Sequence, residues 1–227
     1  MPASQTEYKP SSDLLSGRCI LVTGAGDGIG KAAALAFAQH GADIVLLGRT
    51  RAKLETVSDL ITESTTTSPV IVPADLEGLD EHTAGNLCAS IMSEFGHLDG
   101  LLHNASLLGP KVPIATYPID EWERVIRVNT TAAFILTQAL LPALSASSDA
   151  SVVFTTSGVA RKGRAYWGAY AVSKFATVGL AEVLADELAE TSDIRVNTIN
   201  PGGTRTAMRA AAYPAEDPTT LPTPEDH

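Results

Sequence analysis

Short apolar runs alternate with longer stretches of helical periodicity along most of the chain. The runs are rich in β-branched residues and leucine and show no polar alternation, which is typical of strands buried on both faces of a parallel sheet. The strands predicted in this way are 19–22, 44–47, 70–72, 100–103, 152–155 and 195–199. The helices predicted between them are about 29–39, 52–62, 80–95, 121–145 and 168–190.

Strands that alternate with helices predict an α/β fold with one doubly wound parallel sheet, whose ligand crevice lies at the carboxyl ends of the strands. We divide the chain into a polar lead-in (1–16), the sheet domain (17–206) and a Pro-rich final segment (207–227), which we expect to be a substrate loop or a truncated C-terminal segment. Pro214, Pro218, Pro222 and Pro224 exclude a long helix from the final segment. A segment of this kind is usually a lid, a binding loop or disordered.

Composition and charge narrow the function classes. Of the 227 residues, 44% are hydrophobic and 19% are charged, as in an ordinary globular domain. The net charge of −10 provides no basic surface for nucleic acid. The two cysteines make neither a disulfide framework nor a CxxC pair, and we expect no bound metal.

The sequence also predicts where the protein works. The first residues lack the pattern of a signal peptide. The most apolar run, 131–144, is interrupted by Gln138 and Pro142 and is too short to cross a bilayer. We therefore expect a cytoplasmic protein with no membrane partner.

A glycine-rich turn, Thr23–Gly30, separates the first strand from the first helix. Its spacing is TGxxxGxG, which differs from GxGxxG and from a P-loop. Glycines at this place let backbone N–H groups approach a pyrophosphate at the positive end of the helix. An ordinary strand-to-helix turn is the alternative.

The end of the second strand indicates which cofactor is preferred. Gly48 stands where an acidic residue would bind the ribose 2′-hydroxyl of NAD, and Arg49, Arg51 and Lys53 follow it. Guanidinium groups match a 2′-phosphate, so NADP(H) is favoured and NAD(H) remains open. The alternative is that these cations lie on the solvated first turn of a helix. Asp27, an anion in the phosphate turn, argues mildly against NADP.

Tyr170 and Lys174 stand four residues apart on a predicted helix, so their side chains share one face. A neighbouring cation favours the phenolate and would lower the pKa of Tyr170 from about 10 towards useful acid/base strength. Tyr-x-x-x-Lys alone is common, and a surface pair is the alternative. Ser157 ends the fifth predicted strand, Asn104 follows the fourth, and Asn129 lies within a helix where an amide is a poor choice without a role.

From about Leu15 to Thr206 the chain resembles the short-chain dehydrogenase/reductase family, whose members have a Rossmann fold. The likeness rests on the TGxxxGIG turn, Asp75-Leu76 after the third strand, a variant of the NNAG segment, and the Ser, Tyr-x-x-x-Lys and Pro-Gly motifs in order. The segments around Leu102–Ala105, Trp167–Thr177 and Asn200–Arg209 are similar to bacterial YciK-type oxidoreductases.

The resemblance implies an enzyme that transfers a hydride between a nicotinamide cofactor and a carbonyl or secondary alcohol. Tyr170 would be the acid/base and Lys174 would lower its pKa and bond the nicotinamide ribose. Ser157 would orient the substrate oxygen, and Asn129 would hold a water in the proton relay. The expected cofactor contacts, besides Tyr170 and Lys174, are Gly24, Asp27, Gly28, Ile29, Gly30, Arg49, Asp75, Leu76, Asn104, Ala105, Pro201, Gly202, Thr204 and Thr206.

The chain departs from the family pattern in two places. His103 and Ser106 replace the first Asn and the Gly of NNAG, which casts doubt on close backbone packing there. The family continues with another helix and a final strand, so we expect a truncated form, or an enzyme that lacks one pocket wall and one sheet edge.

Substrate and partners are less determined. The segment 158–167 carries three cations and two rings, which would suit an acidic or an apolar substrate; a subunit contact or a solvated loop is the alternative. Family members often dimerise through the helices near 121–145 and 168–190, so we expect a homodimer or homotetramer. The rival functions are a non-catalytic NADP-binding sensor module of the same fold, a nucleotide-sugar epimerase and, less favoured, a methyltransferase.

Overall fold

The computed structural model describes residues 10–227, and a six-stranded parallel sheet forms its centre. The strand order is β3-β2-β1-β4-β5-β6, which is the doubly wound order expected from the alternating pattern. The Rossmann-type fold predicted from the sequence is therefore confirmed. The strands are β1 (Cys19–Thr23), β2 (Asp43–Gly48), β3 (Val70–Pro73), β4 (Gly100–His103), β5 (Ser151–Thr155) and β6 (Arg195–Ile199).

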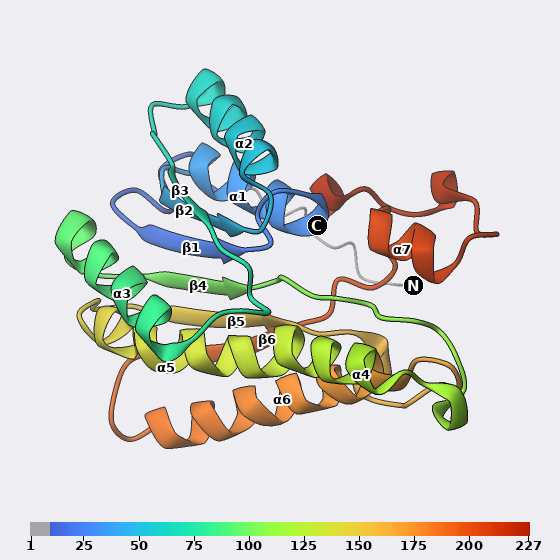
Figure 1. The fold of residues 1–227 in the computed structure, drawn as a ribbon. Helices are drawn as coiled ribbons and strands as arrows, with labels where there is room; N and C mark the ends of the chain where they lie inside the picture. Colours follow the sequence, from blue (N-terminus) through green and yellow to red (C-terminus); the bar gives the residue numbers. More distant parts are fainter. Residues whose placement is uncertain (1–9) are drawn as a thin grey trace, which may run out of the picture.

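Helices cover the two faces of the sheet, and the order of strands explains their distribution. Figure 1 shows α1 and α2 on one face and α3, α5 and α6 on the other. All five residues of β1 are buried between these layers, as its continuous apolar run predicts. The helices are α1 (Gly28–Gln39), α2 (Arg51–Ser64), α3 (Glu81–Phe95), α4 (Ile119–Ile126), α5 (Ala132–Ser145), α6 (Gly168–Leu188) and α7 (Ala207–Ala212).

The helix expected over 121–145 is continuous but not uniform. It begins at Ile119, and the segment Arg127–Thr131 between α4 and α5 forms a π-helical turn. By length and composition Ile119–Ser145 would suffice to cross a membrane, in contrast to the expectation from 131–144, yet half of its most apolar window is buried inside the fold. Since π-turns are frequent at functional sites, the place of Asn129 within this one is informative.

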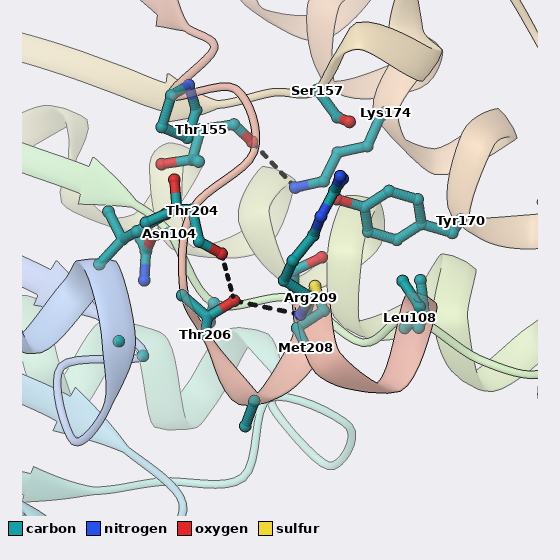
Figure 2. A pocket seen from close by; sticks show the side chains of 18 of the residues that line it. Asn104, Leu108, Thr155, Ser157, Tyr170, Lys174, Thr204, Thr206, Met208 and Arg209 are labelled. Atoms are coloured by element: carbon teal, nitrogen blue, oxygen red, sulfur yellow. Dashed lines mark hydrogen bonds between the residues drawn. The ribbon is translucent and has the colours of Figure 1, made fainter. Parts of the chain in front are cut away.

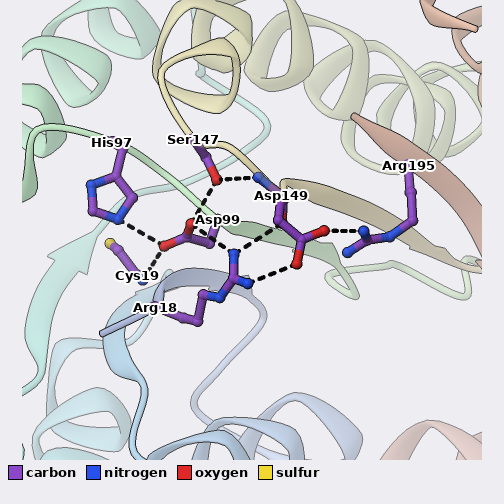
Figure 3. Close-up of polar contacts among 7 residues, drawn as sticks. All are labelled: Arg18, Cys19, His97, Asp99, Ser147, Asp149 and Arg195. Atoms are coloured by element: carbon purple, nitrogen blue, oxygen red, sulfur yellow. Dashed lines mark hydrogen bonds and ion pairs between the residues drawn. The ribbon is translucent and has the colours of Figure 1, made fainter. Parts of the chain in front are cut away.

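A network of polar side chains joins the amino ends of the strands, at the edge of the sheet opposite the ligand crevice (Figure 3). Asp99, which is 8% exposed, lies at its centre. The carboxylate accepts hydrogen bonds from the backbone N–H of Cys19 at 2.8 Å and from the Ser147 hydroxyl at 2.6 Å. It also pairs with Arg18 at 3.2 Å, and His97 Nε2 lies 2.9 Å away. One buried carboxylate thus ties β1 and β4 to the loop before β5.

Replacing Asp99 with Ala is expected to lower the free energy of unfolding by about 3 kcal/mol, because it leaves the buried N–H of Cys19 without its acceptor and removes one of the two carboxylates that pair with Arg18. Urea denaturation would measure the loss. The matched control is Asp149→Ala, which removes a half-exposed partner of Arg18 and Arg195 and is expected to cost clearly less. Equal losses of unfolding free energy in the two variants would show that the burial of Asp99 does not determine its contribution to stability.

The C-terminal segment of the chain borders the ligand side of the sheet. β6 is the edge strand, and Ile199 on it is 51% exposed. After β6, residues up to 227 form α7 and two short 3₁₀ turns, and within the described residues no seventh strand follows. Between α1 and β4–β5 runs a groove of about 840 Å³, with Pro224 and His227 at one end. The prolines limit this segment to short helical pieces, as the sequence predicts.

Candidate active site

The glycine turn between β1 and α1 forms a cradle in which Gly24 and Gly30 leave no room for a Cβ atom. Gly24 has a φ of +67°, and a Cβ on it would lie 2.9 Å from the backbone of Ala105. A Cβ on Gly30 would collide with the carbonyl oxygen of Gly24 and with the amide of Asn104. The turn therefore exposes backbone at the amino end of α1, where N–H groups favour an anion. This geometry fits a cofactor pyrophosphate.

Asp27 caps α1 and is neutralised by a nearby cation. Its carboxylate accepts the N–H of Gly28 at 2.8 Å and lies 2.6 Å from Lys53 Nζ. The ion pair with Lys53 holds the pKa of Asp27 below its usual value. The anion in the phosphate turn therefore argues less strongly against a phosphorylated cofactor than it does in the sequence alone, because its charge is compensated from α2.

A recess of about 430 Å³ continues from the glycine turn across the end of β2 and β3. It brings Arg49, which follows β2, together with Asp75 and Leu76, which follow β3, because β2 and β3 are neighbours in the sheet. Arg51 instead points towards Glu55, 3.7 Å away on the exposed surface of α2. The expected residues that line the recess are Gly24, Asp27, Arg49, Asp75, Leu76 and Ala105, together with Gly48, Thr50 and Lys53.

A second cavity of about 300 Å³ lies at the carboxyl ends of β1, β4 and β5, and its side chains are drawn in Figure 2. Ser157, Tyr170 and Lys174 meet on one side of it. The expected cofactor residues on the rest of its wall are Gly24, Asp27, Gly28, Ile29, Asn104, Ala105, Pro201, Gly202, Thr204 and Thr206. The sequence therefore predicts most of the lining, although the residues come from five separate segments.

Thr23 joins the ends of β1 and β4 beneath this cavity. Its hydroxyl accepts the N–H groups of Asn104 at 2.9 Å and Ala105 at 3.1 Å and donates to the carbonyl of Leu102. The amide of Asn104 in turn donates to the Thr23 carbonyl at 3.3 Å. Ser106, which replaces the family's Gly, lines the cavity beside this junction, and its buried hydroxyl has no hydrogen-bond partner among the described residues.

Tyr170 and Lys174 are both buried, at 8% and 4% exposure. Lys174 Nζ donates to the carbonyl of Thr155 at 2.8 Å and lies 5.6 Å from the centre of the Tyr170 ring. Burial lowers the pKa of Lys174 to about 8. The two side chains therefore do share one face of α6, as their spacing predicts.

The pKa of Tyr170 shifts in a direction opposite to the one expected from the sequence. Burial raises it above the usual value, and the interaction with the Ser157 hydroxyl lowers it only in part. The neighbouring cation can be read from the sequence, but the desolvation of the phenol, which favours its neutral form, depends on the tertiary packing.

Asn129 lies behind the cavity rather than on its wall. Its side-chain amide donates to the carbonyl of Leu107 and to the Ser173 hydroxyl, both at 2.9 Å, and its oxygen accepts the N–H of Leu107 at 2.7 Å. The amide thus fixes the strand-end loop against α6, and both of its N–H groups are occupied.

The sequence predicts a substrate loop in the final segment (207–227), and the structure places the helix α7 of this segment, together with Leu108, on the cavity wall. Leu108, Met208 and Ala212 give the substrate end of the cavity an apolar lining, and Trp167 stands 5.7 Å from the Tyr170 ring. Of the segment 158–167, only Trp167 borders the cavity; Arg161, Lys162 and Arg164 are exposed. The prolines of the final segment predict a lid or binding loop, but no sequence pattern predicts the short helix α7 within it.

Lys111 fastens α7 to this wall. Its ammonium donates to the carbonyl of Ala212 at 2.6 Å and lies 4.7 Å and 4.6 Å from the ring centres of Trp167 and Tyr213. Cation–π contacts of this kind are worth about 1–2 kcal/mol when partly desolvated. The lysine therefore holds the carboxyl end of the helix that covers the cavity.

Replacing Lys111 with Met is expected to speed tryptic cleavage after Arg205 and Arg209 by about tenfold, because α7 then opens more often. Mass spectrometry of the early fragments would measure it. Lys162→Met, which removes an exposed cation nearby, serves as the control and should leave the rate unchanged. Protection that stays at the wild-type level in Lys111→Met would exclude the fastening role.

Comparison with known proteins agrees with this geometry. A model of the family named short chain dehydrogenase matches residues 18–217. The chain belongs to the short-chain dehydrogenase family. Its match covers the whole sheet and both cavities, so the site residues lie within the shared region.

Similar short-chain dehydrogenases are known in enteric bacteria. The oxidoreductase YciK of Escherichia coli K12 is 51% identical over 219 residues, which cover 96% of this chain and 86% of YciK. The solved structure of E. coli YciK superposes with a TM-score of 0.93, covering 97% of this chain and 89% of that one. A Shigella flexneri structure complexed with NADP is 50% identical, with a TM-score of 0.93 and coverage of 95% and 90%. The resemblance to YciK-type oxidoreductases is confirmed.

Proposed function

We propose that this short-chain dehydrogenase uses NADP(H) to interconvert a carbonyl compound and a secondary alcohol, with Tyr170 as the acid/base. The observation that carries the proposal is one continuous site, in which a glycine cradle, a cation-bearing recess and a Ser–Tyr–Lys group with buried Tyr170 and Lys174 border the same crevice. A bound nicotinamide would supply the hydride. The other tasks at this site, which are the positioning of the substrate and the transfer of the proton, are performed by the chain's own side chains.

Ser157, Tyr170 and Lys174 each have a distinct task. The Tyr170 phenol, held neutral by burial, donates its proton to the carbonyl oxygen as the hydride arrives. Ser157 fixes that oxygen beside the phenol. Lys174, fastened to the end of β5 through Thr155, places positive charge where it stabilises the phenolate that remains.

The preference for NADP(H) rests on Arg49 and Lys53. Both line the recess beyond the glycine turn, and Gly48 offers no carboxylate to a ribose hydroxyl. Similar proteins from Shigella flexneri and Escherichia coli were crystallised with NADP and NADPH. A 2′-phosphate in the recess would form charge-assisted hydrogen bonds with the guanidinium of Arg49.

Replacing Arg49 with Gln is expected to weaken NADPH binding by about 10- to 100-fold, the effect of losing a charge-assisted pair, and to leave NADH binding unchanged. Titration of cofactor fluorescence would measure both constants. Arg51→Gln is the control, because Arg51 faces Glu55 and not the recess. An equal loss for NADPH and NADH would mean that Arg49 does not read the phosphate.

We also expect the protein to work in the cytoplasm on a small molecule and to form a homodimer or homotetramer. Exposed apolar side chains on α5 and α6 support a helix-to-helix contact: Phe134 is 46% exposed, Phe175 45% and Val183 56%. Sedimentation would test the assembly. A monomer at all concentrations would contradict it.

The experiment that tests the proposed function is the oxidation of NADPH over a panel of small aldehydes and ketones. Turnover that requires both Tyr170 and a carbonyl compound supports an enzyme. Tight NADPH binding without turnover of any member would favour the sensor alternative instead.

A further inference from the structure

Arg209 is a charged side chain of the cavity wall that the proposed function leaves without a task. Within the described part of the chain, the charged residues that line this cavity are Asp27, Lys174 and Arg209. Asp27 pairs with Lys53 at the cofactor end, and Lys174 belongs to the proton-transfer group around Tyr170. Figure 2 shows the Arg209 side chain extending from α7 towards that group. The structure therefore places one further cation where a substrate would lie.

The guanidinium of Arg209 is held along one edge and leaves its other edge available. Its Nε and Nη2 each donate a hydrogen bond of 2.6 Å to the carboxylate of Glu216. Its central carbon lies 3.9 Å from the centre of the Tyr213 ring, which supports the group from one face. Nη1 has no hydrogen-bond acceptor of ordinary geometry within residues 10–227. Because the guanidinium is a rigid fork with five donors, the edge that ends in Nη1 can bind a second planar anion.

Positive charge is in excess around this end of the cavity. The ring of Tyr213 has Lys111 at 4.6 Å as well as Arg209, and its hydroxyl lies 3.5 Å from Nη1 of Arg164. In the part of the chain that the structure describes, Glu216 is the one carboxylate that forms an ion pair with any of these three cations. In a protein with a net charge of −10, such a local excess attracts an anion that the rest of the surface repels.

The size and lining of the cavity limit what this anion can be. Leu108, Met208 and Ala212 form an apolar wall on and beside α7, which suits a hydrocarbon chain. The cavity of about 300 Å³ must also admit the nicotinamide ring, so only a small substrate fits. The bond to Glu216 shows that a carboxylate fits this guanidinium with two parallel hydrogen bonds. The combination matches a short acid better than a neutral ketone.

We propose that the substrate is a small oxo acid, or the corresponding hydroxy acid, whose carboxylate binds the free edge of Arg209 while its carbonyl lies at Tyr170. This inference rests on the proposed function and names the substrate class of the same site. Arg209 determines specificity, and Glu216 positions it by holding the opposite edge of the guanidinium. The carboxylate takes no part in the bond changes: the carbonyl is reduced to the alcohol, and NADPH is oxidised.

The test compares each acid with its neutral counterpart in the same enzyme. Straight-chain oxo acids of increasing length, each beside its methyl ester, are assayed with NADPH, and the ratio of kcat/KM for acid and ester is taken. For the acid that reacts best, we expect a wild-type ratio of about 10 to 100, the effect of a charge-assisted pair. Arg209→Gln should lower this ratio to about one, mainly through the KM of the acid, and leave the ester within about twofold.

Arg205→Gln is the matched control. Arg205 lies on the same segment and donates hydrogen bonds to the carbonyls of Pro218 and Leu221, but it does not line the cavity. Its variant loosens the segment without removing the cation, so the ratio should stay at the wild-type value. Should Arg209→Gln fail to fold, Arg209→Lys replaces it: it keeps the charge but loses the planar fork, and it should lower the ratio by about tenfold.

Three results would overturn the proposal. They are equal kcat/KM values for acid and ester in the wild type, an equal loss for acid and ester in Arg209→Gln, and a loss of NADPH affinity in that variant as large as the loss for the acid. The last result would mean that Arg209 holds a phosphate of the cofactor instead.

A binding measurement separates this inference from the proposed function. Calorimetry of the protein saturated with NADP⁺ compares hexanoate with hexanamide, neither of which can be reduced at a ketone. We expect hexanoate to bind at least about tenfold more tightly, and Arg209→Gln to abolish the difference. Turnover of ketones without a preference for acids would contradict the substrate class alone. Binding of hexanoate through Arg209 without turnover of any carbonyl compound would contradict the proposed function alone.

Discussion

Replacing Tyr170 with Phe is expected to lower the rate of carbonyl-dependent NADPH oxidation by about 1,000-fold while NADPH affinity stays within about twofold. The ring is kept, so the packing against Trp167 and Val159 survives. Only the proton that must reach the carbonyl oxygen is lost. General acid catalysis typically contributes 10²- to 10⁴-fold to the rate, and the expected loss of about 1,000-fold is the middle of that range. Single-turnover absorbance at 340 nm and cofactor fluorescence would measure rate and affinity separately.

Tyr166→Phe is the matched control for this loss. Tyr166 is 58% exposed and does not border the cavity, so its phenol has no route to the substrate. Its variant should turn over as the wild type does. Equal rates for Tyr170→Phe and the wild type would remove Tyr170 from the mechanism and leave the fold as a cofactor-binding scaffold.

Replacing Lys174 with Met is expected to reduce turnover by at least about 100-fold and at the same time to stabilise the protein at pH 7. The folded protein lowers the pKa of this lysine from 10.5 to about 8, so it disfavours the charged form. That difference corresponds to about 3 kcal/mol, from which the lost hydrogen bond to Thr155 removes about 1 kcal/mol. We therefore expect a net gain of about 2 kcal/mol.

The sign of the pH dependence makes this prediction specific. Below pH 8 the lysine is protonated in both states, so the wild type bears the full cost of burying the charge. Between pH 8 and 10.5 the folded protein releases its proton first, and the stability of the wild type rises relative to the variant. Urea denaturation at pH 7 and pH 10 would measure the difference in free energy of unfolding between Lys174→Met and the wild type at each pH. Lys162→Met, an exposed control, should show no such difference at either pH. A stabilisation by Lys174→Met that grows with pH would contradict the cost of burial.

The strands and the ligand edge follow from the sequence because each depends on local pattern. The run Cys19–Val22 is apolar throughout and becomes the fully buried β1, and the glycines after it leave space only for backbone. Parallel strands end at one edge, so residues such as Asn104 and Ser157 meet there despite their distance in sequence. Topology therefore turns separate motifs into one site.

Other features depend on packing that a linear pattern does not encode. The π-helical turn around Asn129 has ordinary helical periodicity in sequence. The apolar wall of α7 consists of alanines and a methionine that only the tertiary structure brings to the cavity. The upward shift in the pKa of Tyr170 also depends on packing, since desolvation is set by how completely neighbours surround the phenol.

The most direct test of this account is a crystal structure of the protein with NADP⁺. We predict the pyrophosphate on the turn at Gly28–Gly30, the 2′-phosphate beside Arg49, and the reactive carbon of the nicotinamide within about 5 Å of the Tyr170 oxygen, close to a productive approach. A nicotinamide ring outside the cavity, or a phenol turned away from it, would contradict the assignment of Tyr170 as the acid/base.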